Sequence, residues 1–399
     1  MKIGILTGGG DVPPLNIVIN TVREIAVKSG NTLIGFVNGW QGVLSNNTIS
    51  LNDYSNFSSI GGTFLKSSRI NLLFEDNGVE KANLNLNQLG IEGLIIIGGD
   101  DTLSNAYYIS QCPCLLVSKT IDNDIGFIDD DMSNFIPQNI INYFTLGFPT
   151  AANKIATYAS LDQGLRTTAY SHERIIILES MGMHSGWLAL ASGYGDPDFI
   201  IVPEYPIDYA QFCEKLIELY LKQKHAIVVV AEGAKFNNDK YIKADYGETD
   251  NFENPRFGGS SLVLRDMLKE DLKKSFDTRN INAVNPSYLY RSGKPNNIDR
   301  EISVSIGKLA IEMLLKGTVD GVTLLSVALE NKDFVVKSVP LTFFKQTEND
   351  RFPKRQINSM FYDEDELSLT TNGYEYFKHI IDESIKTDFG KSSKNKYCY

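Results

Sequence analysis

The stretch from Leu94 to Thr102, LIIIGGDDT, constrains the fold of this chain more than any other. An unbroken apolar run that ends in paired glycines and paired carboxylates is typical of a strand buried on both faces of a parallel sheet, with a binding site at its carboxyl end. Gly98 and Gly99 lack a Cβ and let a phosphate approach the backbone, whereas Asp100 and Asp101 supply oxygens suited to Mg²⁺ or to a lysine partner. A strand, a tight turn and a helix N-cap would give the same pattern, so this stretch alone leaves both interpretations open.

The composition argues against two classes of partner. The chain has 399 residues, of which 42% are hydrophobic, which is enough for two domains with their own cores. Its formal net charge of −11 disfavours a nucleic acid or an anionic membrane as a partner. No apolar run approaches the roughly 18 residues of a membrane span, and the amino terminus has no signal-peptide pattern. We therefore expect a cytoplasmic protein in which any anionic substrate is held by a local basic cluster.

The amino-terminal segment has the pattern of a phosphate cradle. Lys2–Leu6 is an apolar run, Thr7–Asp11 is a glycine-rich turn, and a helical pattern runs from Leu15 to Ile25. In such an arrangement backbone N–H groups and the helix amino end face an anion. The spacing is not G-x-G-x-x-G, so a simple phosphate cradle is favoured over a dinucleotide fold, and a purely structural turn stays possible.

Two further segments carry polar groups suited to phosphoryl chemistry. Gly61–Arg69 is a glycine-rich loop with small hydrogen-bond donors, and it ends in an arginine whose planar guanidinium suits a phosphoryl group. A solvent-exposed loop without a ligand would have the same sequence pattern. The apolar run Cys114–Val117 leads into Ser118–Asp124, where Asp122 and Asp124 can divide roles between a proton and a metal. Because adjacent parallel strands end at one edge of a sheet, we expect these residues to lie beside Asp100 and Asp101.

The remainder of the chain alternates short apolar runs with longer helical patterns, which predicts an α/β fold with parallel sheets. A polar stretch at 235–261 is expected to be an insertion or a lid, and residues 390–399 a polar tail. The predicted strands are His172–Leu178, Phe199–Val202 and Ala226–Val230, and the predicted helices are Asn139–Leu165, Leu262–Leu272 and Ile302–Leu315.

Taken together, these segments resemble the 6-phosphofructokinase family, which uses ATP or pyrophosphate. The resemblance runs from residue 2 to about residue 325. It rests on six motifs that appear in the family's order: Gly8–Asp11, Gly61–Arg69, Gly98–Asp101, Lys119–Asp124, His172–Arg174 with Met181–Gly182, and Ala231–Gly233. It implies an α/β fold of two similar three-layer domains with mainly parallel sheets. Residues 1–137 with about 290–341 would form the phosphoryl-donor domain, and residues 138–289 with about 342–399 the sugar-phosphate domain.

The resemblance also implies roles for individual residues. Asp122 matches the general base that takes a proton from the C1 hydroxyl of fructose 6-phosphate. Thr120 matches a donor to the transferring phosphoryl group, Lys119 is its neutralising cation, and Arg69 matches an arginine that bridges both phosphorylated partners. These four form the predicted catalytic set.

The family's remaining site residues are carried over in the same way. Asp100 and Asp124 match carboxylates on the side of the magnesium ion. Arg174 matches an arginine that reaches the sugar-phosphate site of a neighbouring subunit, so a homodimer or homotetramer is expected. The predicted donor-binding residues are Gly9, Gly10, Asp101, Thr102 and Lys119, and the predicted sugar-phosphate-binding residues are Arg174, Met181, Gly182, Glu232, Tyr288 and Arg291.

Asp101 and Lys119 bear on the identity of the phosphoryl donor. ATP-using members commonly have glycine at both positions, whereas pyrophosphate-using members resemble this chain. A carboxylate at Asp101 would crowd and repel an α-phosphate, and Lys119 offers a cation to free pyrophosphate. A lysine also occurs in members that use ATP, so the aspartate is the stronger indication. We expect pyrophosphate, with ATP as the alternative.

Several positions depart from the family's pattern, among them Ser118, which replaces a usual proline. Pro14 replaces a usual glycine, Met183 stands where an arginine is usual, Tyr288 takes the place of a histidine, and Asn282 stands where a second phosphate-binding arginine is expected. These changes leave open another acceptor, such as sedoheptulose 7-phosphate, or a catalytically weak regulatory homologue. The intact carboxylates favour an active enzyme.

Overall fold

The computed structural model describes all residues except 129–134, 161–162, 244–257, 320, 342–353 and 386–399. The chain divides into two compact units. The first comprises Met1–Asp130, Ile136–Thr150 and Arg291–Arg355, and the second comprises Asp131–Phe135, Ala151–Tyr290 and Gln356–Tyr399. Each unit is thus assembled from segments far apart in the sequence. The expected division of donor and sugar-phosphate binding between them stays a prediction.

The first unit contains a seven-stranded sheet of order β11-β10-β5-β4-β1-β2-β3. The five inner strands pair in parallel, and the two outermost strands are antiparallel to their neighbours. Its strands are β1 (Lys2–Thr7), β2 (Thr32–Phe36), β3 (Thr48–Ser50), β4 (Gly93–Gly98), β5 (Cys114–Ser118), β10 (Val322–Glu330) and β11 (Asp333–Pro340). Its helices are α1 (Leu15–Lys28), α2 (Gly39–Ser45), α3 (Gly78–Gln88), α4 (Asp100–Ser104) and α10 (Asn297–Leu315).

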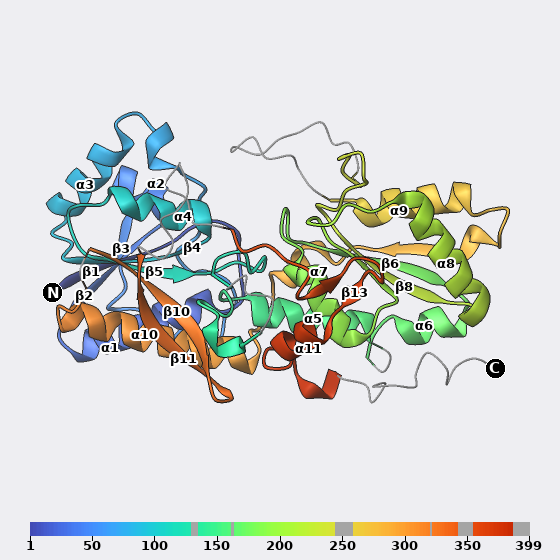
Figure 1. Cartoon of the computed structure of the whole chain (residues 1–399). Helices are drawn as coiled ribbons and strands as arrows, with labels where there is room; N and C mark the ends of the chain where they lie inside the picture. The colour runs from blue at the N-terminus through green and yellow to red at the C-terminus, as the bar shows by residue number, and fades with distance from the viewer. Residues whose placement is uncertain (129–134, 161–162, 244–257, 320, 342–353, 386–399) are drawn as a thin grey trace. The chain divides into compact units, whose positions relative to one another are not determined.

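Helices cover both faces of this sheet, which explains why its central strands are apolar throughout. Every residue of β4 is buried, as expected for a strand covered on both sides. In Figure 1, α1 and α10 lie on one face and α2, α3 and α4 lie on the other. Trp40 of α2 is buried in the core, and its indole N–H donates to the carbonyl oxygen of Thr102 at 2.9 Å. This bond fastens α4, which begins directly after the glycines of the site, to the core.

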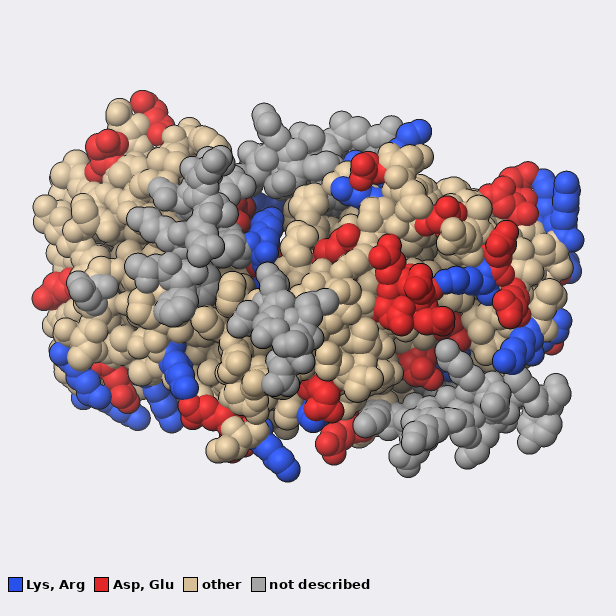
Figure 2. Space-filling model, viewed as in Figure 1, with Lys and Arg blue, Asp and Glu red and all other residues tan. Residues whose placement is uncertain are grey.

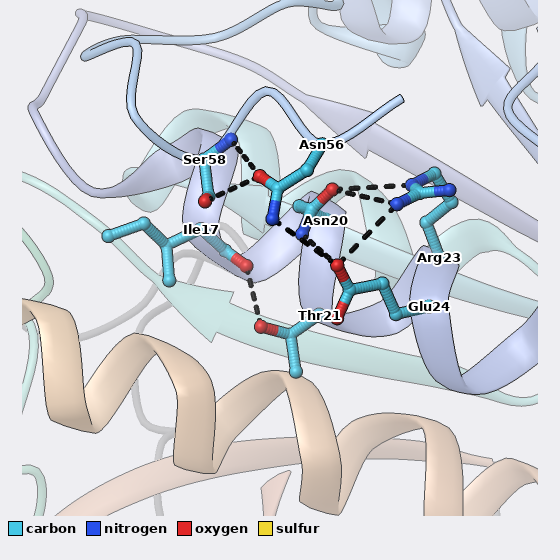
Figure 3. A network of polar contacts seen from close by, with 7 residues as sticks. All are labelled: Ile17, Asn20, Thr21, Arg23, Glu24, Asn56 and Ser58. Atoms are coloured by element: carbon cyan, nitrogen blue, oxygen red, sulfur yellow. Dashed lines mark hydrogen bonds and ion pairs between the residues drawn. The ribbon is translucent and has the colours of Figure 1, made fainter. Parts of the chain in front are cut away.

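The polar face of α1 fixes the chain that leads into the Gly61 loop (Figure 3). The Asn20 amide accepts from the Arg23 guanidinium at 3.1 and 3.3 Å and donates to Glu24 at 2.9 Å. Glu24 also accepts from Asn56 at 3.4 Å, and Asn56 in turn accepts from the backbone N–H of Ser58 at 2.8 Å. The segment before Gly61 is therefore tied to a buried helix.

The second unit contains a smaller sheet of four parallel strands in the order β7-β8-β6-β9 and a separate β12-β13 hairpin. In Figure 1, α9 lies on one side of this sheet and α6 on the other. Its strands are β6 (Ile175–Ser180), β7 (Phe199–Ile201), β8 (Ala226–Ala231), β9 (Ile281–Val284), β12 (Tyr362–Asp363) and β13 (Ser368–Leu369). Its helices are α5 (Phe148–Ala159, whose first turn belongs to the first unit), α6 (Arg166–Ser171), α7 (Trp187–Ala191), α8 (Tyr209–Gln223), α9 (Ser260–Asp271) and α11 (Thr371–Phe377).

Aromatic side chains join the carboxyl-terminal segment to the core of the second unit. Trp187 is fully buried, and its ring centroid lies 5.2 Å from that of Phe361 and 5.0 Å from that of Tyr376. Edge-on and tilted contacts of this kind add to the free energy gained by burying the rings. Residues 361–377 are thus an integral part of this unit.

The predicted α/β class with mainly parallel sheets is confirmed by these two sheets. The predicted helix Asn139–Leu165 is wrong at its amino end, because α5 begins only at Phe148. Leu146 instead forms a parallel bridge with Lys119, and Ile141 an antiparallel bridge with Phe127, so pairing with the loop after β5 replaces helical hydrogen bonds. Most of the predicted insertion at 235–261, and the whole tail at 390–399, lie outside the described residues.

A membrane-spanning helix was not expected. Within the described ranges, no helix combines the length and the apolar character that crossing a bilayer requires.

The turn before α5 is held by a buried carboxylate on α10. Asp299 is fully buried, and it accepts from the backbone N–H groups of Gly147 at 2.8 Å and of Thr150 at 2.9 Å. The hydroxyl of Thr150 also donates to it. One side chain thus satisfies several donors of a turn that is remote in sequence.

Replacing this carboxylate should destabilise the first unit. Asp299→Ala leaves buried N–H groups without their acceptor, which costs about 1–3 kcal/mol for each group that finds no water. Urea unfolding should therefore show a lower transition midpoint. Glu301→Ala, two residues further on and exposed, is the matched control and should unfold as the wild type does. Equal midpoints for the two variants would contradict the role given to Asp299.

Candidate active site

The candidate site of the first unit lies where three parallel strands end at one edge of the sheet. Thr7 of β1 is level with Ile97 of β4, and Gly98 is level with Ser118 of β5. The turns after these strands are hydrogen-bonded to each other, because the N–H of Gly8 donates to Ile97 at 3.0 Å and the N–H of Lys119 donates to Gly98 at 2.9 Å. The three motifs predicted to form one site are therefore adjacent.

The glycines at these strand ends are required by close packing. A Cβ built on Gly8 would lie 2.5 Å from the Thr102 side chain, and one built on Gly98 would lie 2.3 Å from it. Thr102 is buried, so its side chain packs between the two turns, and its expected contact with the donor stays a prediction. Gly9 has a φ of +77°, and a Cβ there would lie 3.0 Å from Nζ of Lys119. Side chains at these positions would separate the turns.

Lys119 is a buried cation in the middle of this edge. Its side chain is 2% exposed, and Nζ donates to the carbonyl oxygen of Gly10. Burial, together with the positive charge of Arg291, lowers the pKa of Lys119 to about 7, although the charges of Asp122 and Asp11 oppose the shift. A lysine that loses its proton near neutral pH is stabilised in the charged form by any anion that binds next to it.

The predicted carboxylates lie close enough to influence one another's ionisation. Burial, together with the negative charges of Asp122 and Asp100, raises the pKa of Asp124 to about 7, although the positive charge of Lys354 opposes the shift. The guanidinium of Arg291 lies 4.0 Å from Oδ1 of Asp122. The structure thus brings together the predicted base, both predicted metal carboxylates and two cations.

Arg291 belongs to the first unit. A Cβ built on Gly10 would lie 2.6 Å from its Nη1, so the guanidinium lies directly over the amino-terminal turn. The family resemblance assigns this arginine to the sugar-phosphate contacts. Its position beside Asp122 and Gly10 also suits contact with the transferring phosphoryl group.

The Gly61–Arg69 loop packs against the first glycine turn. The Thr7 hydroxyl is 2.8 Å from that of Thr63, and the N–H of Gly9 donates to the carbonyl of Ser68 at 3.1 Å. The N–H of Phe64 donates to the side chain of Asn16 at 2.6 Å. Arg69 at the end of this loop influences the pKa of Lys119, which places its charge at the same edge.

Asp101 follows Asp100 in the first turn of α4 and is half-buried. Thr120 is buried, and its hydroxyl accepts from the backbone N–H of Asp122 at 3.0 Å. This bond fixes the peptide that carries the predicted base, a supporting role that the sequence did not indicate.

In the second unit, Glu232 holds the turn after β6. Its Oε1 accepts from the backbone N–H groups of Gly182 and Met183, both at 2.9 Å. A Cβ on Gly233 would lie 1.6 Å from the carbonyl oxygen of Met183, so the two turns are in direct contact. The structure therefore brings Glu232 together with the turn that contains Met181 and Gly182, and one oxygen of Glu232 is engaged by that turn. Their binding of a sugar phosphate stays a prediction.

Glu179, which the sequence did not single out, fixes the neighbouring elements. It is buried and accepts from the N–H of Gly259 at 2.9 Å, the hydroxyl of Ser261 at 2.8 Å and the amide of Asn285 at 2.8 Å. The hydroxyl of Tyr290 donates to its backbone carbonyl at 2.9 Å. Tyr290 is therefore a core residue.

Two other predicted sugar-phosphate residues, Tyr288 and Arg174, have different surroundings. Tyr288 is 76% exposed. Arg174 precedes β6, whereas Met181 follows it, and a strand of 6 residues spans about 20 Å. Arg174 therefore cannot join Met181 and Glu232 within one subunit, and its guanidinium donates to the hydroxyl of Thr168 at 2.7 Å.

A cavity of about 150 Å³ in the second unit is a poor candidate for the substrate site. Asp208, Glu364 and Asp365 are among its lining residues, and none of the predicted site residues lines it. These carboxylates would repel a phosphate. Figure 2 shows acidic and basic side chains interspersed over the visible face. At the edge of the first sheet, by contrast, the positive charges of Lys119 and Arg291 lie close to each other.

Comparison with known proteins supports the interpretation of the motifs. A family model described as "Phosphofructokinase" matches residues 2–314. The pyrophosphate--fructose 6-phosphate 1-phosphotransferase of Dictyoglomus thermophilum is 36% identical over 323 residues, which cover 79% of this chain and 87% of that protein. The ATP-dependent 6-phosphofructokinase 3 of Streptomyces coelicolor is 36% identical over 361 residues, which cover 87% of this chain and 99% of that protein.

The fold is similar to that of solved structures. The crystal structure of the pyrophosphate-dependent phosphofructokinase from Nitrosospira multiformis superposes with a TM-score of 0.78 at 21% identity, covering 96% of this chain and 92% of that one. At this identity the likeness concerns the fold alone. The match of the family model over most of the chain and the similarity of the relatives establish that the chain belongs to the phosphofructokinase family of phosphotransferases.

Proposed function

We propose that this chain transfers a phosphoryl group from pyrophosphate to the C1 hydroxyl of fructose 6-phosphate, in a Mg²⁺-dependent reaction with Asp122 as general base. The observation that carries the proposal is the grouping of Asp122 and Asp124 with Lys119 and Arg291 at one edge of the first sheet. Phosphoryl transfer needs little covalent chemistry from a protein, because positioning and charge neutralisation supply most of the catalysis.

In this mechanism Asp122 accepts the proton of the attacking hydroxyl. Lys119, Arg291 and Arg69 neutralise charge on the oxygens of the transferring group, which is worth more at a buried edge than in water. The backbone of Gly9 and Gly10 lies within reach of Lys119 and lets the donor approach closely. Met181, Gly182 and Glu232 are proposed to bind the sugar phosphate, and Arg174 to serve the site of a neighbouring subunit in a homodimer or homotetramer.

The carboxylates fit a magnesium ion. Asp124 has a raised pKa because it is buried near Asp122 and Asp100, and a divalent cation would relieve that repulsion. Among the residues that the structure describes, no three His, Cys, Asp or Glu side chains form a group that could hold a metal by themselves. Mg²⁺ is usually held by one or two carboxylates together with substrate phosphates and water. Asp100 and Asp124 would hold the ion, which when bound supplies charge neutralisation on the phosphates.

Pyrophosphate is favoured over ATP by Asp101 and Lys119. A buried lysine against Gly10 adds positive charge where a compact anion would lie, and the carboxylate of Asp101 in the first turn of α4 would repel an α-phosphate. The relatives include proteins named for each donor at 36% identity, so similarity does not separate the two. ATP is therefore the alternative donor.

A donor comparison tests this proposal directly. With fructose 6-phosphate and Mg²⁺, the purified protein should form fructose 1,6-bisphosphate with pyrophosphate and much less with ATP. Asp101→Gly should raise the ratio of kcat/KM for ATP to that for pyrophosphate by about tenfold or more, which corresponds to removing about 1.4 kcal/mol of repulsion. A wild-type preference for ATP would overturn the choice of donor, and product with neither donor would overturn the activity.

Removing the base should abolish turnover without abolishing binding. Asp122→Asn keeps the shape of the side chain but cannot accept the proton, so kcat should fall by about 10²–10⁴-fold while both KM values change by less than about threefold. Asp53→Asn, at an exposed position of the same unit, is the control. An Asp122→Asn enzyme that retains more than a tenth of the wild-type kcat would show that another group is the base.

Binding of pyrophosphate should take up a proton above neutral pH. The pKa of Lys119 is lowered to about 7 in the free protein, and the bound anion raises it again, so the ligand binds the ammonium form. The affinity for pyrophosphate should then weaken by up to about tenfold per pH unit as the pH rises from 7 towards 9. This loss is expected in addition to any change that the ionisation of pyrophosphate itself causes.

Calorimetric titration at pH 8 in two buffers of different ionisation enthalpy measures this uptake. Lys119→Met should abolish the proton uptake that comes from the protein, so that only the uptake by pyrophosphate itself remains. An identical proton uptake by the wild type and the variant would contradict the assignment.

A further inference from the structure

The chain returns to the catalytic edge of the first unit close to its carboxyl end. Arg355 is the last residue assigned to that unit, and it lies beyond residues 2–314 that match the family model. Its side chain is only 4% exposed. Lys354, just before it, forms an antiparallel bridge with Ile125. This short segment is therefore packed against the loop that follows β5.

The Arg355 guanidinium holds two backbone carbonyls that are far apart in sequence. Its Nε and Nη2 donate to the carbonyl oxygen of Asn123 at 3.0 and 2.8 Å, and its Nη1 donates to that of Asn142 at 2.7 Å. Nη2 also reaches the side-chain oxygen of Asn123. The backbone N–H of Arg355 donates to the carbonyl oxygen of Asp124 at 2.7 Å. One residue thus binds both peptide units of Asn123–Asp124.

Asn123 needs such support because its backbone is in a sparsely populated region. It has a φ of +56° although it is not glycine, and it is fully buried. Its side chain accepts from the N–H of Thr145 at 3.1 Å as well as from Arg355. The left-handed turn directs the two flanking residues, Asp122 and Asp124, and their directions change if the turn relaxes.

The space around the guanidinium is filled on its other side. A Cβ built on Gly126 would lie 2.7 Å from Nη1 of Arg355 and 2.8 Å from the carbonyl oxygen of Asn142. Asn142, in turn, donates to the carbonyl oxygen of Ile125 at 2.7 Å. The guanidinium therefore packs directly against the backbone of the loop at Gly126.

We propose that Arg355 is a positioning residue for phosphoryl transfer: its guanidinium fixes the Asn123 peptide and thereby sets the directions of the Asp122 and Asp124 carboxylates. The proposal rests on the proposed function, in which Asp122 is the base and Asp124 holds the metal. Arg355 contacts neither partner of the reaction in this account, so its loss affects the alignment of the reacting groups more than their binding. A misplacement of about 1 Å can cost about 100-fold in rate.

The planar fork, and not only the charge, is essential to this role. Two N–H groups of one guanidinium converge on a single carbonyl while a third reaches another, which a lysine ammonium cannot reproduce at the same positions. Arg355→Lys keeps the charge and most of the volume, and Arg355→Met keeps only the volume. If geometry is what matters, the two variants should have similar defects.

The test compares steady-state kinetics of the two variants with those of the wild type, using whichever donor the wild type accepts. We expect kcat to fall by about 100-fold in both variants, with KM for each substrate changed by less than about threefold. Arg265→Lys, at a partly exposed arginine of α9 paired with Asp266 at 2.8 Å, is the control and should keep the wild-type kcat. A folded variant with unchanged kcat, or one whose defect lies in KM, would overturn the proposal.

Hydrogen exchange of the ligand-free proteins supplies a readout that does not depend on activity. Backbone amides in residues 120–125 should exchange at least about tenfold faster in Arg355→Lys than in the wild type, whereas those of the second sheet should be unchanged. Uniformly faster exchange would indicate general destabilisation and overturn the local role, as would no change in residues 120–125. If the wild type shows no turnover with either donor, the proposed function fails, and this measurement still decides whether Arg355 fixes the loop.

Discussion

The removal of charged groups from water at the edge of the first sheet is the constraint on which the site depends. Burial shifts the pKa of Lys119 down to about 7 and that of Asp124 up to about 7, so each group is close to losing its charge. Neighbouring charges offset only part of that cost. An anion would favour the ammonium form of the lysine, and a divalent cation would favour the carboxylate form of the aspartate. Two ligands of opposite charge therefore relieve two separate electrostatic penalties in one place.

Both units fix their functional turns in the same physical way, with a buried side chain that binds backbone groups remote in sequence. Such turns contain residues with positive φ, among them Asn123 and Met183, whose conformation is unfavourable unless other contacts determine it. The side chains and the turns they hold are Glu232 with Gly182–Met183, Asp299 with Gly147–Thr150, Glu179 with Gly259–Ser261 and Arg355 with Asn123–Asp124. The backbone of these turns is thus held by single side chains that each bind more than one backbone group.

The sequence predicted the parts of the site that follow from local pattern. The apolar runs before Gly98 and Lys119 predicted adjacent parallel strands, and their ends are level in the sheet. It did not predict that residues 140–147 pair with the loop after β5, because their apolar spacing also fits a helix. Nor did it indicate Asp299 or Arg355, since a single polar residue carries no local signal for a partner more than a hundred residues away.

Arg174 differs from Asp299 and Arg355 because a sequence motif did indicate it as a site residue. The fold, however, determines which groups its side chain can reach. Its place before β6, with Met181 after it, follows from strand geometry and could not be inferred from the spacing alone.

The division of the first unit into separate segments has a consequence for biosynthesis. Its strands β1 to β5 leave the ribosome well before β10, which pairs with β5, and before Arg355, which binds the loop after β5. The second unit, most of which lies between residues 151 and 290, is translated inside this interval. A nascent chain therefore carries an incomplete sheet edge at β5 until β10 has been made, and the loop after β5 reaches its final conformation only after Arg355 has been made.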